Sequence, residues 1–282
     1  MIRNKFKATA FVLVAFFLFD GCSPATKPAA QESTVIDLAY QPQPVSSYEA
    51  ERCKLDLYLP ADMAHAPVLI WVHGGNIEKN SKDSLEAVNI GRRMAKEGIA
   101  TAVISYRLSP EASYPAYVED VVAATQWIAA HIGDYGGENS SIFLGGHSAG
   151  AYLVAMAAMN PDYKLATHVA GVIAISGQMD THGTVKKERG LPADSSIVSA
   201  AAPLFYVSEK VPPFLILYAD QDIPGRAAIN DRFAKAMSSA GNAVQVEEIA
   251  NRDHVSIVTS ILNETDETSK WMKQFILSHQ EK

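Results

Sequence analysis

The sequence predicts an α/β fold, in which a mostly parallel central sheet carries helices on both faces. Short apolar runs alternate with longer helix-like stretches along most of the chain, which is the pattern of strands joined by crossover helices. Hydrophobic residues make up 48% of the 282 residues, enough to bury a sheet on both faces. No repeat or low-complexity block interrupts this pattern, so residues 45–282 are expected to form one domain.

The expected strands are short, mostly apolar runs, which suit strands buried on both faces. They cover residues 68–72, 100–104, 141–145, 169–175, 214–218 and 244–249. The expected helices follow these runs, near residues 84–97, 117–132, 149–159, 226–240 and 255–277. The stretch 181–199 has charges, glycines and no persistent apolar period, so a short cap or rim loop is expected there.

The first 44 residues differ in composition from the rest. Residues 1–21 combine three basic side chains near the start with an apolar run, 8–19, that is too short to span a bilayer comfortably. This pattern predicts an export signal that is removed. Residues 22–44 hold four prolines among small and polar residues, which favours a flexible tether over a packed core.

Two cysteines occur in the chain, and neither is expected to form an intramolecular disulfide if the first is acylated. Cys22 follows Gly21 and the apolar run, so it resembles the acylated cysteine of the bacterial lipoprotein lipobox, and lipidation would attach the protein to a membrane. Ordinary cleavage nearby and an uncleaved anchor are the alternatives. In each case we expect the domain outside the cytoplasm, in the periplasm or on the outer membrane if the source is bacterial. Cys53 is expected to be buried and unreactive.

Charge and residue spacing argue against several kinds of partner. The formal net charge of −7 argues against nucleic acid as a ligand. The histidines show no His-Glu-x-x-His pattern, and the cysteines are not paired, so no metal site is expected. No cofactor is expected either.

Ser148 stands in the middle of residues 146–150, Gly-His-Ser-Ala-Gly, between an expected strand and an expected helix. A sharp strand-to-helix turn of this kind exposes a nucleophilic side chain. Gly146 and Gly150 have a steric reason to be there, because a Cβ would obstruct so tight a turn. The alternative is a glycine-rich turn capped by a hydroxyl group.

A second glycine turn, His73-Gly74-Gly75, follows the apolar run 68–72. Acyl transfer requires donors for the oxyanion that forms when a carbonyl is attacked. The amides of Gly74 and Gly75, with that of Ala149, are the candidates for this oxyanion hole. His73 is expected to support the turn rather than to act in catalysis.

With these motifs in view, the chain resembles the α/β-hydrolase superfamily, and within it the small esterases with a His-Gly-Gly loop, including carboxylesterases and the kynurenine-formamidase-like group. The resemblance extends from about Leu55 to the C-terminus, and Asn76 departs from it, because a third glycine or an aromatic residue is usual there. The resemblance rests on Leu-Asp-Leu-Tyr-Leu-Pro at 55–60, His-Gly-Gly at 73–75, Ser-Tyr-Arg-Leu at 105–108, Tyr-Pro at 114–115, the serine turn, and Pro-Pro-Phe-Leu-Ile-Leu-Tyr at 212–218.

The resemblance implies the order serine, acid, histidine along the chain. His254 lies between an expected strand and the terminal helix, and Asp222 matches the family's position for the acid. Asp220 competes with Asp222 but is closer to the strand end and suited to closing a turn. Asp253 also competes, although a helix N-cap suits it better. The resulting catalytic prediction is Ser148, Asp222 and His254.

The expected function is that of a serine hydrolase for carboxylic esters, with a small-molecule ester or amide as substrate. The short cap suggests short acyl chains, because a long chain needs extended apolar walls. An arylformamidase-like amide hydrolase is the nearest alternative, and a binding protein that keeps the scaffold without activity is a third. The residues proposed to contact substrate are Asn76, His147, Gln178, Met179 and His182.

Overall fold

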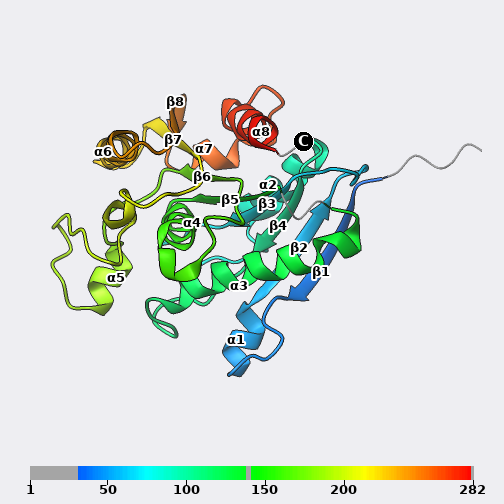
Figure 1. Cartoon of the computed structure of the whole chain (residues 1–282), viewed down its shortest axis with the longest axis horizontal. Helices are drawn as coiled ribbons and strands as arrows, with labels where there is room; N and C mark the ends of the chain where they lie inside the picture. The colour runs from blue at the N-terminus through cyan, green and yellow to red at the C-terminus, as the bar shows by residue number, and fades with distance from the viewer. Residues whose placement is uncertain (1–30, 138–140, 281–282) are drawn as a thin grey trace, which may run out of the picture.

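A computed structural model describes residues 31–137 and 141–280. Its centre is an eight-stranded sheet with the order β1-β2-β4-β3-β5-β6-β7-β8 (Figure 1). The strands β1 and β2 are antiparallel to their neighbours, and all other pairs are parallel. The fold class predicted from the sequence is therefore confirmed. The strands are β1 (Ser33–Ala39), β2 (Lys54–Leu59), β3 (Val68–Val72), β4 (Ala100–Ile104), β5 (Ile142–His147), β6 (Gly171–Ile175), β7 (Phe214–Gln221) and β8 (Val244–Asp253).

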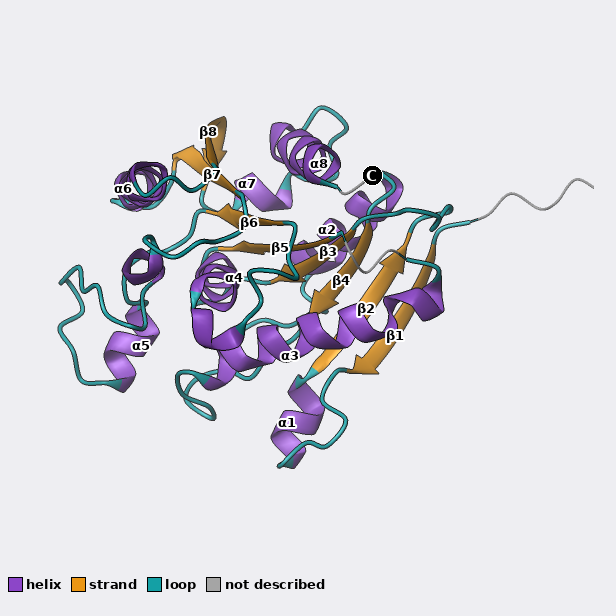
Figure 2. Ribbon diagram, viewed as in Figure 1, coloured by secondary structure: helices purple, strands orange, loops and turns teal. Residues whose placement is uncertain are grey.

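Helices cover both faces of the sheet (Figure 2). The helices α3, α4 and α6 pack on one face, and α2, α7 and α8 pack on the other. The α-helices are α1 (Ser47–Arg52), α2 (Leu85–Lys96), α3 (Ala116–His131), α4 (Ala149–Met159), α5 (Gly183–Glu188), α6 (Arg226–Ser239), α7 (Ser256–Thr259) and α8 (Glu267–His279). Short 3₁₀ helices are η1 (Ile132–Tyr135), η2 (Pro161–Tyr163) and η3 (Pro203–Tyr206).

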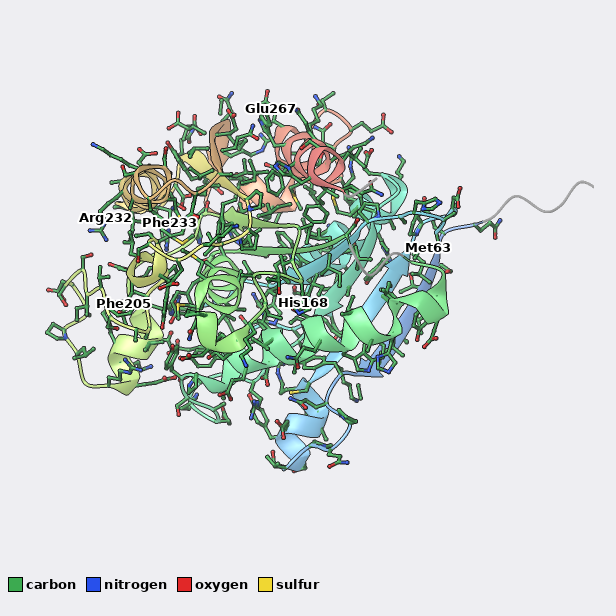
Figure 3. The ribbon with its side chains drawn as sticks, in the orientation of Figure 1. Met63, His168, Phe205, Arg232, Phe233 and Glu267 are labelled. Atoms are coloured by element: carbon green, nitrogen blue, oxygen red, sulfur yellow. The ribbon has the colours of Figure 1, made fainter. Side chains whose placement is uncertain are left out.

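The alternation of side chains along each strand divides the core in two. In β3, Ile70 joins the cluster under α3 and α4, whereas the neighbouring Trp71 joins the cluster under α2 and α8. Every residue of α4 is buried, which explains why that helix is apolar on all sides. In α6, Phe233 faces the sheet and its neighbour Arg232 is exposed (Figure 3).

The C-terminal helix expected over residues 255–277 is in fact two helices, α7 and α8. The segment 260–266 separates them. Asp266 begins α8, because its carboxylate accepts a hydrogen bond from the amide of Ser269. Asn263 accepts one from the amide of Thr265, which closes a turn before the helix. The prediction of one continuous helix was wrong because these local bonds compete with helix continuation.

The tether expected over residues 22–44 is also corrected, because β1 lies within it. β1 pairs with β2 at the edge of the sheet. Lys82 joins the two strands, because its Nζ atom lies 2.9 Å from carboxylate oxygens of both Asp37 in β1 and Asp56 in β2. β1 is mostly exposed, so it lacks the apolar run that identified the central strands. The export signal and Cys22 lie outside the described residues, and export and lipidation stay predictions. No helix in the described part of the chain is long and apolar enough to cross a membrane.

Candidate active site

Ser148 lies at the turn from β5 to α4, as the sequence predicts. Its backbone has φ 55° and ψ −113°, a strained conformation that is typical of an exposed nucleophile. The Ser148 amide donates to the carbonyl oxygen of Ile175 at 2.8 Å, which holds the turn against β6. A Cβ at Gly146 would lie 2.5 Å from the Gly150 carbonyl carbon, and one at Gly150 would lie 2.0 Å from the Val72 oxygen. Only glycine fits at these two positions.

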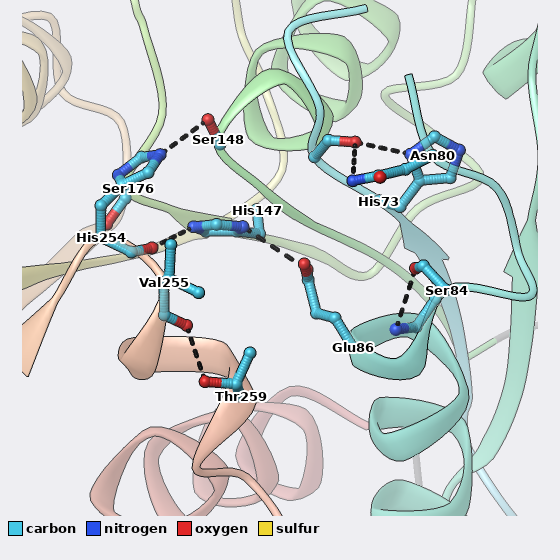
Figure 4. Close-up of polar contacts among 12 residues, drawn as sticks. His73, Asn80, Ser84, Glu86, His147, Ser148, Ser176, His254, Val255 and Thr259 are labelled. Carbon is cyan, nitrogen blue, oxygen red and sulfur yellow. Dashed lines mark hydrogen bonds and ion pairs between the residues drawn. The ribbon is translucent and has the colours of Figure 1, made fainter.

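The structure brings the three predicted catalytic residues into sequential contact. The His254 Nε2 atom lies 2.9 Å from the Ser148 Oγ atom, and the His254 Nδ1 atom lies 2.6 Å from the Asp222 Oδ1 atom. Figure 4 shows the contact between Ser148 and His254. Each side chain comes from the carboxyl end of a parallel strand, β5, β7 or β8, so the shared sheet edge places them together. This geometry allows a proton to move from hydroxyl to imidazole.

Asp222 accepts hydrogen bonds from other groups in addition to His254. The Ser176 hydroxyl donates to its Oδ2 atom at 2.5 Å, and the amide of Ile223 donates to its Oδ1 atom at 2.8 Å. Burial alone would raise the pKa of Asp222, but the hydrogen bonds from His254 and Ser176 outweigh it and lower the pKa to about 2. The carboxylate is therefore charged and fixed in orientation.

The two competing aspartates have other partners. Asp220 accepts the backbone amides of Asn251 and Arg252, each at 2.9 Å, and so joins the end of β7 to the end of β8. Asp253 accepts the amides of Val255 and Ser256 at the start of α7, which is a capping role. Among the described residues, the His254 ring has its hydrogen bonds with Asp222 and Ser148, and neither competing aspartate takes part in them.

Three backbone amides beside Ser148 are unpaired. Within the described residues, the amides of Gly74, Gly75 and Ala149 have no hydrogen-bond acceptor. Gly74 is adjacent to the nucleophile, because a Cβ built on it would lie 3.3 Å from the Ser148 Cβ. Gly75 has φ 116°, and a Cβ there would lie 2.3 Å from the Lys79 oxygen, so glycine is required. These amides have the character needed in an oxyanion hole.

Neighbouring side chains support the loop of residues 73–80, which we call the glycine loop. The buried His73 ring lies 2.7 Å from the Gly74 carbonyl oxygen and stacks on Tyr106, whose hydroxyl donates to the His73 carbonyl oxygen at 3.0 Å. The Asn80 amide group also donates to the Gly74 oxygen, at 3.3 Å. Burial lowers the pKa of His73 to about 4, so its ring is neutral. A supporting role fits this burial.

A cavity of about 540 Å³ opens over the Ser148 hydroxyl. Of the residues proposed to contact substrate, Asn76, His147 and His182 line this cavity. Gln178 lines a neighbouring cavity instead, and Met179 is fully buried in the core beside Gly177. The prediction that Met179 contributes to the pocket was wrong, because its side chain fills space under the loop that follows β6.

The expected cap over residues 181–199 contains α5 and is fastened to the glycine loop. The Thr184 hydroxyl donates to the Asn76 carbonyl oxygen at 2.5 Å, and Lys187 forms an ion pair with Glu78 at 2.9 Å. His182 begins α5 by accepting the Thr184 amide at its Nδ1 atom. The cap is thus a short segment held over one side of the cavity.

Several residues near the site were not predicted from the sequence. Ser176, Glu86 and Arg226 have no local motif that identifies them, since each reaches the site only through the packing of separate elements. His147 was predicted as a substrate contact, and it also has a structural contact, because its Nε2 atom lies 2.7 Å from the His254 carbonyl oxygen (Figure 4).

One cluster of possible metal ligands occurs among the described residues, away from the site: Glu49, Cys53 and Asp120. Arg107 already binds both carboxylates, at 3.2 Å from Glu49 and 2.6 Å from Asp120. Burial raises the pKa of the Cys53 thiol to about 12, so the thiolate that binds metals is disfavoured. The cluster is a buried ion-pair group, and the absence of a metal site stays a prediction.

Comparison with known proteins now identifies the family. The family model BD-FAE matches residues 55–230, which is more than half of the chain. The chain belongs to the BD-FAE family. This is a family of α/β-hydrolase esterases, so the resemblance predicted from the sequence motifs is confirmed.

Two curated relatives illustrate the similarity of the BD-FAE chain. Esterase LipQ of Mycobacterium tuberculosis (strain ATCC 25618 / H37Rv) is 30% identical over 262 residues, which cover 80% of this chain and 62% of LipQ. Kynurenine formamidase of Danio rerio is 27% identical, with 81% of this chain and 79% of the relative covered. The chain spans less than two thirds of LipQ and 48% of Esterase LipC.

Solved structures share the fold of this BD-FAE chain. A truncated form of carbohydrate esterase from gut microbiota superposes with a TM-score of 0.73 at 19% identity, covering 91% of this chain and 99% of that one. The hyperthermophilic esterase from the archaeon Pyrobaculum calidifontis has a TM-score of 0.67 at 22% identity, covering 90% and 84%. At these identities the comparison shows the fold alone.

Proposed function

We propose that this protein hydrolyses carboxylic esters through an acyl-enzyme formed on Ser148. The observation that carries the proposal is the continuous chain of contacts from Asp222 through His254 to the Ser148 hydroxyl, at 2.6 Å and 2.9 Å. A serine hydroxyl is a weak nucleophile at neutral pH, and an adjacent imidazole activates it by accepting its proton. Membership of the BD-FAE family supports the ester hydrolase class, and the contact geometry supports the choice of catalytic residues.

The proposed mechanism has two halves. His254 removes the proton from Ser148 as the hydroxyl oxygen attacks the ester carbonyl, and Asp222 stabilises the imidazolium that forms. Unpaired amides of the glycine loop and of Ala149 donate to the oxyanion. His254 then protonates the departing alcohol, which leaves the acyl group on Ser148. Water attacks this acyl-enzyme with His254 as base, and the acid product and free hydroxyl are released.

The cavity supports a short acyl chain. Its lining over Ser148 is largely polar and charged, and includes Asn76, Glu86, His182 and Arg226. A long alkyl chain gains little from such walls, since its burial needs apolar contact. We expect 4-nitrophenyl acetate and butyrate to be hydrolysed with higher kcat/KM than the decanoate ester. A clear preference for decanoate would overturn this part of the proposal.

A fluorophosphonate probe tests the catalytic assignment directly. The probe should label the wild-type protein and should fail to label Ser148→Ala, and ester hydrolysis should fall by at least about 1000-fold in that variant. Ser239→Ala, an exposed serine at the end of α6, is the matched control and should behave as wild type. Labelling that survives in a folded Ser148→Ala protein would refute the assignment.

Amide hydrolysis is a second candidate, because kynurenine formamidase is among the relatives and aligns along 79% of its own length. Esters and amides use the same triad and differ chiefly in how strongly the leaving group must be protonated. Parallel kcat/KM measurements on phenyl acetate and on an N-formyl aryl amine separate the two. We expect the ester to be the better substrate, and a higher kcat/KM for the amide would reverse the ranking.

A further inference from the structure

Arg226, the first residue of α6, lines two cavities at once. One is the 540 Å³ cavity over Ser148, and the other, of about 530 Å³, lies between the cap and α6. Gln178, Asp180 and Arg232 are also among the residues that line the second cavity. Arg226 therefore borders the space in which a substrate at Ser148 would lie.

The guanidinium of Arg226 has no partner among the described residues. Its Nε atom is buried without a hydrogen bond, and no carboxylate lies within ion-pair distance of the group. Burial lowers the pKa of Arg226, and the negative charges of Asp222 and Asp180 oppose this effect only in part. Arg226 is half-buried, and a charge that is partly withdrawn from water without a bonded partner is destabilising, so the guanidinium is available to an anion.

The two neighbouring carboxylates are already engaged. Asp222 accepts hydrogen bonds from His254, Ser176 and two backbone amides. Asp180 accepts one from the Gln178 side chain at 2.9 Å. These bonds keep both carboxylates from turning toward Arg226 without the loss of existing contacts. An incoming anion would meet a donor group that the protein itself leaves unused.

The backbone around Arg226 adds further donors. Gly225 precedes α6 and has no side chain to cap the helix. Within the described residues, the amides of Ala227 and Ala228 in the first turn have no acceptor. Unpaired amides at a helix N-terminus favour negative charge, and here they stand beside the guanidinium.

The charge of the second cavity agrees with an anionic ligand. Lys186 and Arg232 line it together with Arg226, against the two carboxylates of Asp180 and Asp194. Lys186 donates to two backbone carbonyl oxygens, at 2.6 Å and 2.9 Å, and has no ion pair with a carboxylate among the described residues. Three cations therefore stand against two carboxylates in this lining, and of the three only Arg226 also lines the cavity over Ser148, where Lys79 is a further cation.

We propose that Arg226 binds a carboxylate carried by the substrate, so that the enzyme prefers esters that bear a negatively charged group a few bonds from the scissile carbonyl. The inference rests on the proposed function and adds the substrate class to it. The carboxylate can stand on the acyl side or on the alcohol side of the ester, and matched substrates distinguish the two.

Two substrate pairs test the inference. The acyl-side pair is the mono-4-nitrophenyl ester of adipic acid and the same ester with the free carboxylate converted to a primary amide. The alcohol-side pair is 4-acetoxybenzoate and 4-acetoxybenzamide. We expect wild-type enzyme to favour the charged member of at least one pair by roughly tenfold or more in kcat/KM, as a charged hydrogen-bonded pair allows. The pair that shows this preference identifies whether Arg226 binds a carboxylate on the acyl side or on the alcohol side of the ester.

The variant Arg226→Met should abolish this preference, lowering kcat/KM for the charged ester at least about tenfold more than for its neutral partner. Lys235→Met removes one positive charge from an exposed position on the same helix and should keep the wild-type ratio. Equal losses on both members of the pair in Arg226→Met, or no preference in wild type, would overturn the inference. Activity on the neutral esters, lost in Ser148→Ala, would still uphold the proposed function.

A measurement on the wild-type protein covers the case in which Arg226→Met does not fold. Adipate and its diamide are compared as competitive inhibitors of 4-nitrophenyl acetate hydrolysis at constant ionic strength. We expect the inhibition constant of adipate to be at least about tenfold lower than that of the diamide. Equal inhibition constants for the two compounds would overturn the inference without any variant.

Discussion

The Nε2 atom of His147 lies 2.7 Å from the carbonyl oxygen of His254, so the residue before Ser148 holds the loop that carries His254. The other ring nitrogen of His147 lies 3.4 Å from the Glu86 carboxylate, at the start of α2. Burial alone would raise the pKa of Glu86, but the interaction with His147 outweighs it and lowers the pKa. The Glu86 carboxylate thereby helps to position the His254 loop through His147.

Replacing His147 tests this positioning role. His147→Leu removes the donor to the His254 carbonyl oxygen, and we expect kcat to fall roughly tenfold with little change in KM. His147→Gln keeps a donor of similar reach and should recover most of the lost kcat. Steady-state kinetics on 4-nitrophenyl acetate measures both. A loss that appears in KM alone, with kcat intact, would favour a substrate contact instead.

Ser176 should matter to catalysis although it touches neither the nucleophile nor the base. Its hydroxyl bonds Asp222, and its removal frees one carboxylate oxygen, so we expect Ser176→Ala to lower kcat roughly tenfold. Ser176 has φ 51°, so Ser176→Gly, which suits that backbone, is the matched variant. Both variants should lose activity equally, as measured by kcat at pH 7.5. Recovery in the glycine variant alone would attribute the loss to backbone strain.

The residues that the sequence identified share one property. Ser148, Asp222 and His254 each directly follow a strand of the parallel part of the sheet, and the carboxyl ends of parallel strands meet at one edge. Their proximity follows from topology, so a correct set of strands and a family order suffice to predict it. The choice of Asp222 over Asp220 depended on the family's position, and the hydrogen bonds agree with it.

What the sequence did not reveal depends on packing between distant segments. Ser176 follows β6 as a plain serine, and only the register of β6 beside β7 brings it to Asp222. Met179 looked like a loop residue, yet it is fully buried, because the chain after β6 turns inward. Arg226 looked like an ordinary helix start. Only the folded structure shows that Arg226 has no bonded partner, because the neighbouring carboxylates of Asp222 and Asp180 are hydrogen-bonded to other groups.

Acid should destabilise the protein through His182. Burial, with a smaller contribution from the charges of Arg226 and Lys186, lowers its pKa to about 3. The unfolded chain takes up a proton near the ordinary value of about 6.5, so the stability that neutral His182 supplies is complete above that pH and declines below it. Acidification from pH 7 to pH 5 should lower the free energy of unfolding by about 2 kcal/mol through His182 alone.

The variant His182→Asn isolates that contribution, because an asparagine oxygen can still accept the Thr184 amide at the start of α5. Urea unfolding at pH 7 and pH 5 should show a smaller loss of stability in the variant than in wild type. His168→Asn, at an exposed histidine, should keep the wild-type difference. If all three proteins lost the same free energy on acidification, the role of His182 would be refuted.

The buried ion pair of Arg107 and Asp120 should be the most costly of the described charge pairs to break. Asp120 is fully buried and accepts the Arg107 backbone amide at 2.8 Å as well as its guanidinium at 2.6 Å. Asp120→Asn keeps the shape and removes the charge, which leaves Arg107 with Glu49 alone, so we expect a loss of about 3 kcal/mol in unfolding free energy.

The exposed pair of Lys96 and Glu264 is the matched control, because both side chains are more than half exposed. Glu264→Gln should change stability by less than about 0.5 kcal/mol, since solvent screens such a pair. Urea unfolding of both variants at pH 7 makes the comparison. Because neither Arg107 nor Asp120 lines the cavity over Ser148, Asp120→Asn should retain kcat at 25 °C while folded. If Asp120→Asn lowered the unfolding free energy by less than about 1 kcal/mol, Glu49 alone would be enough to compensate the charge of Arg107. The prediction that this buried pair is the most costly to break would then be wrong.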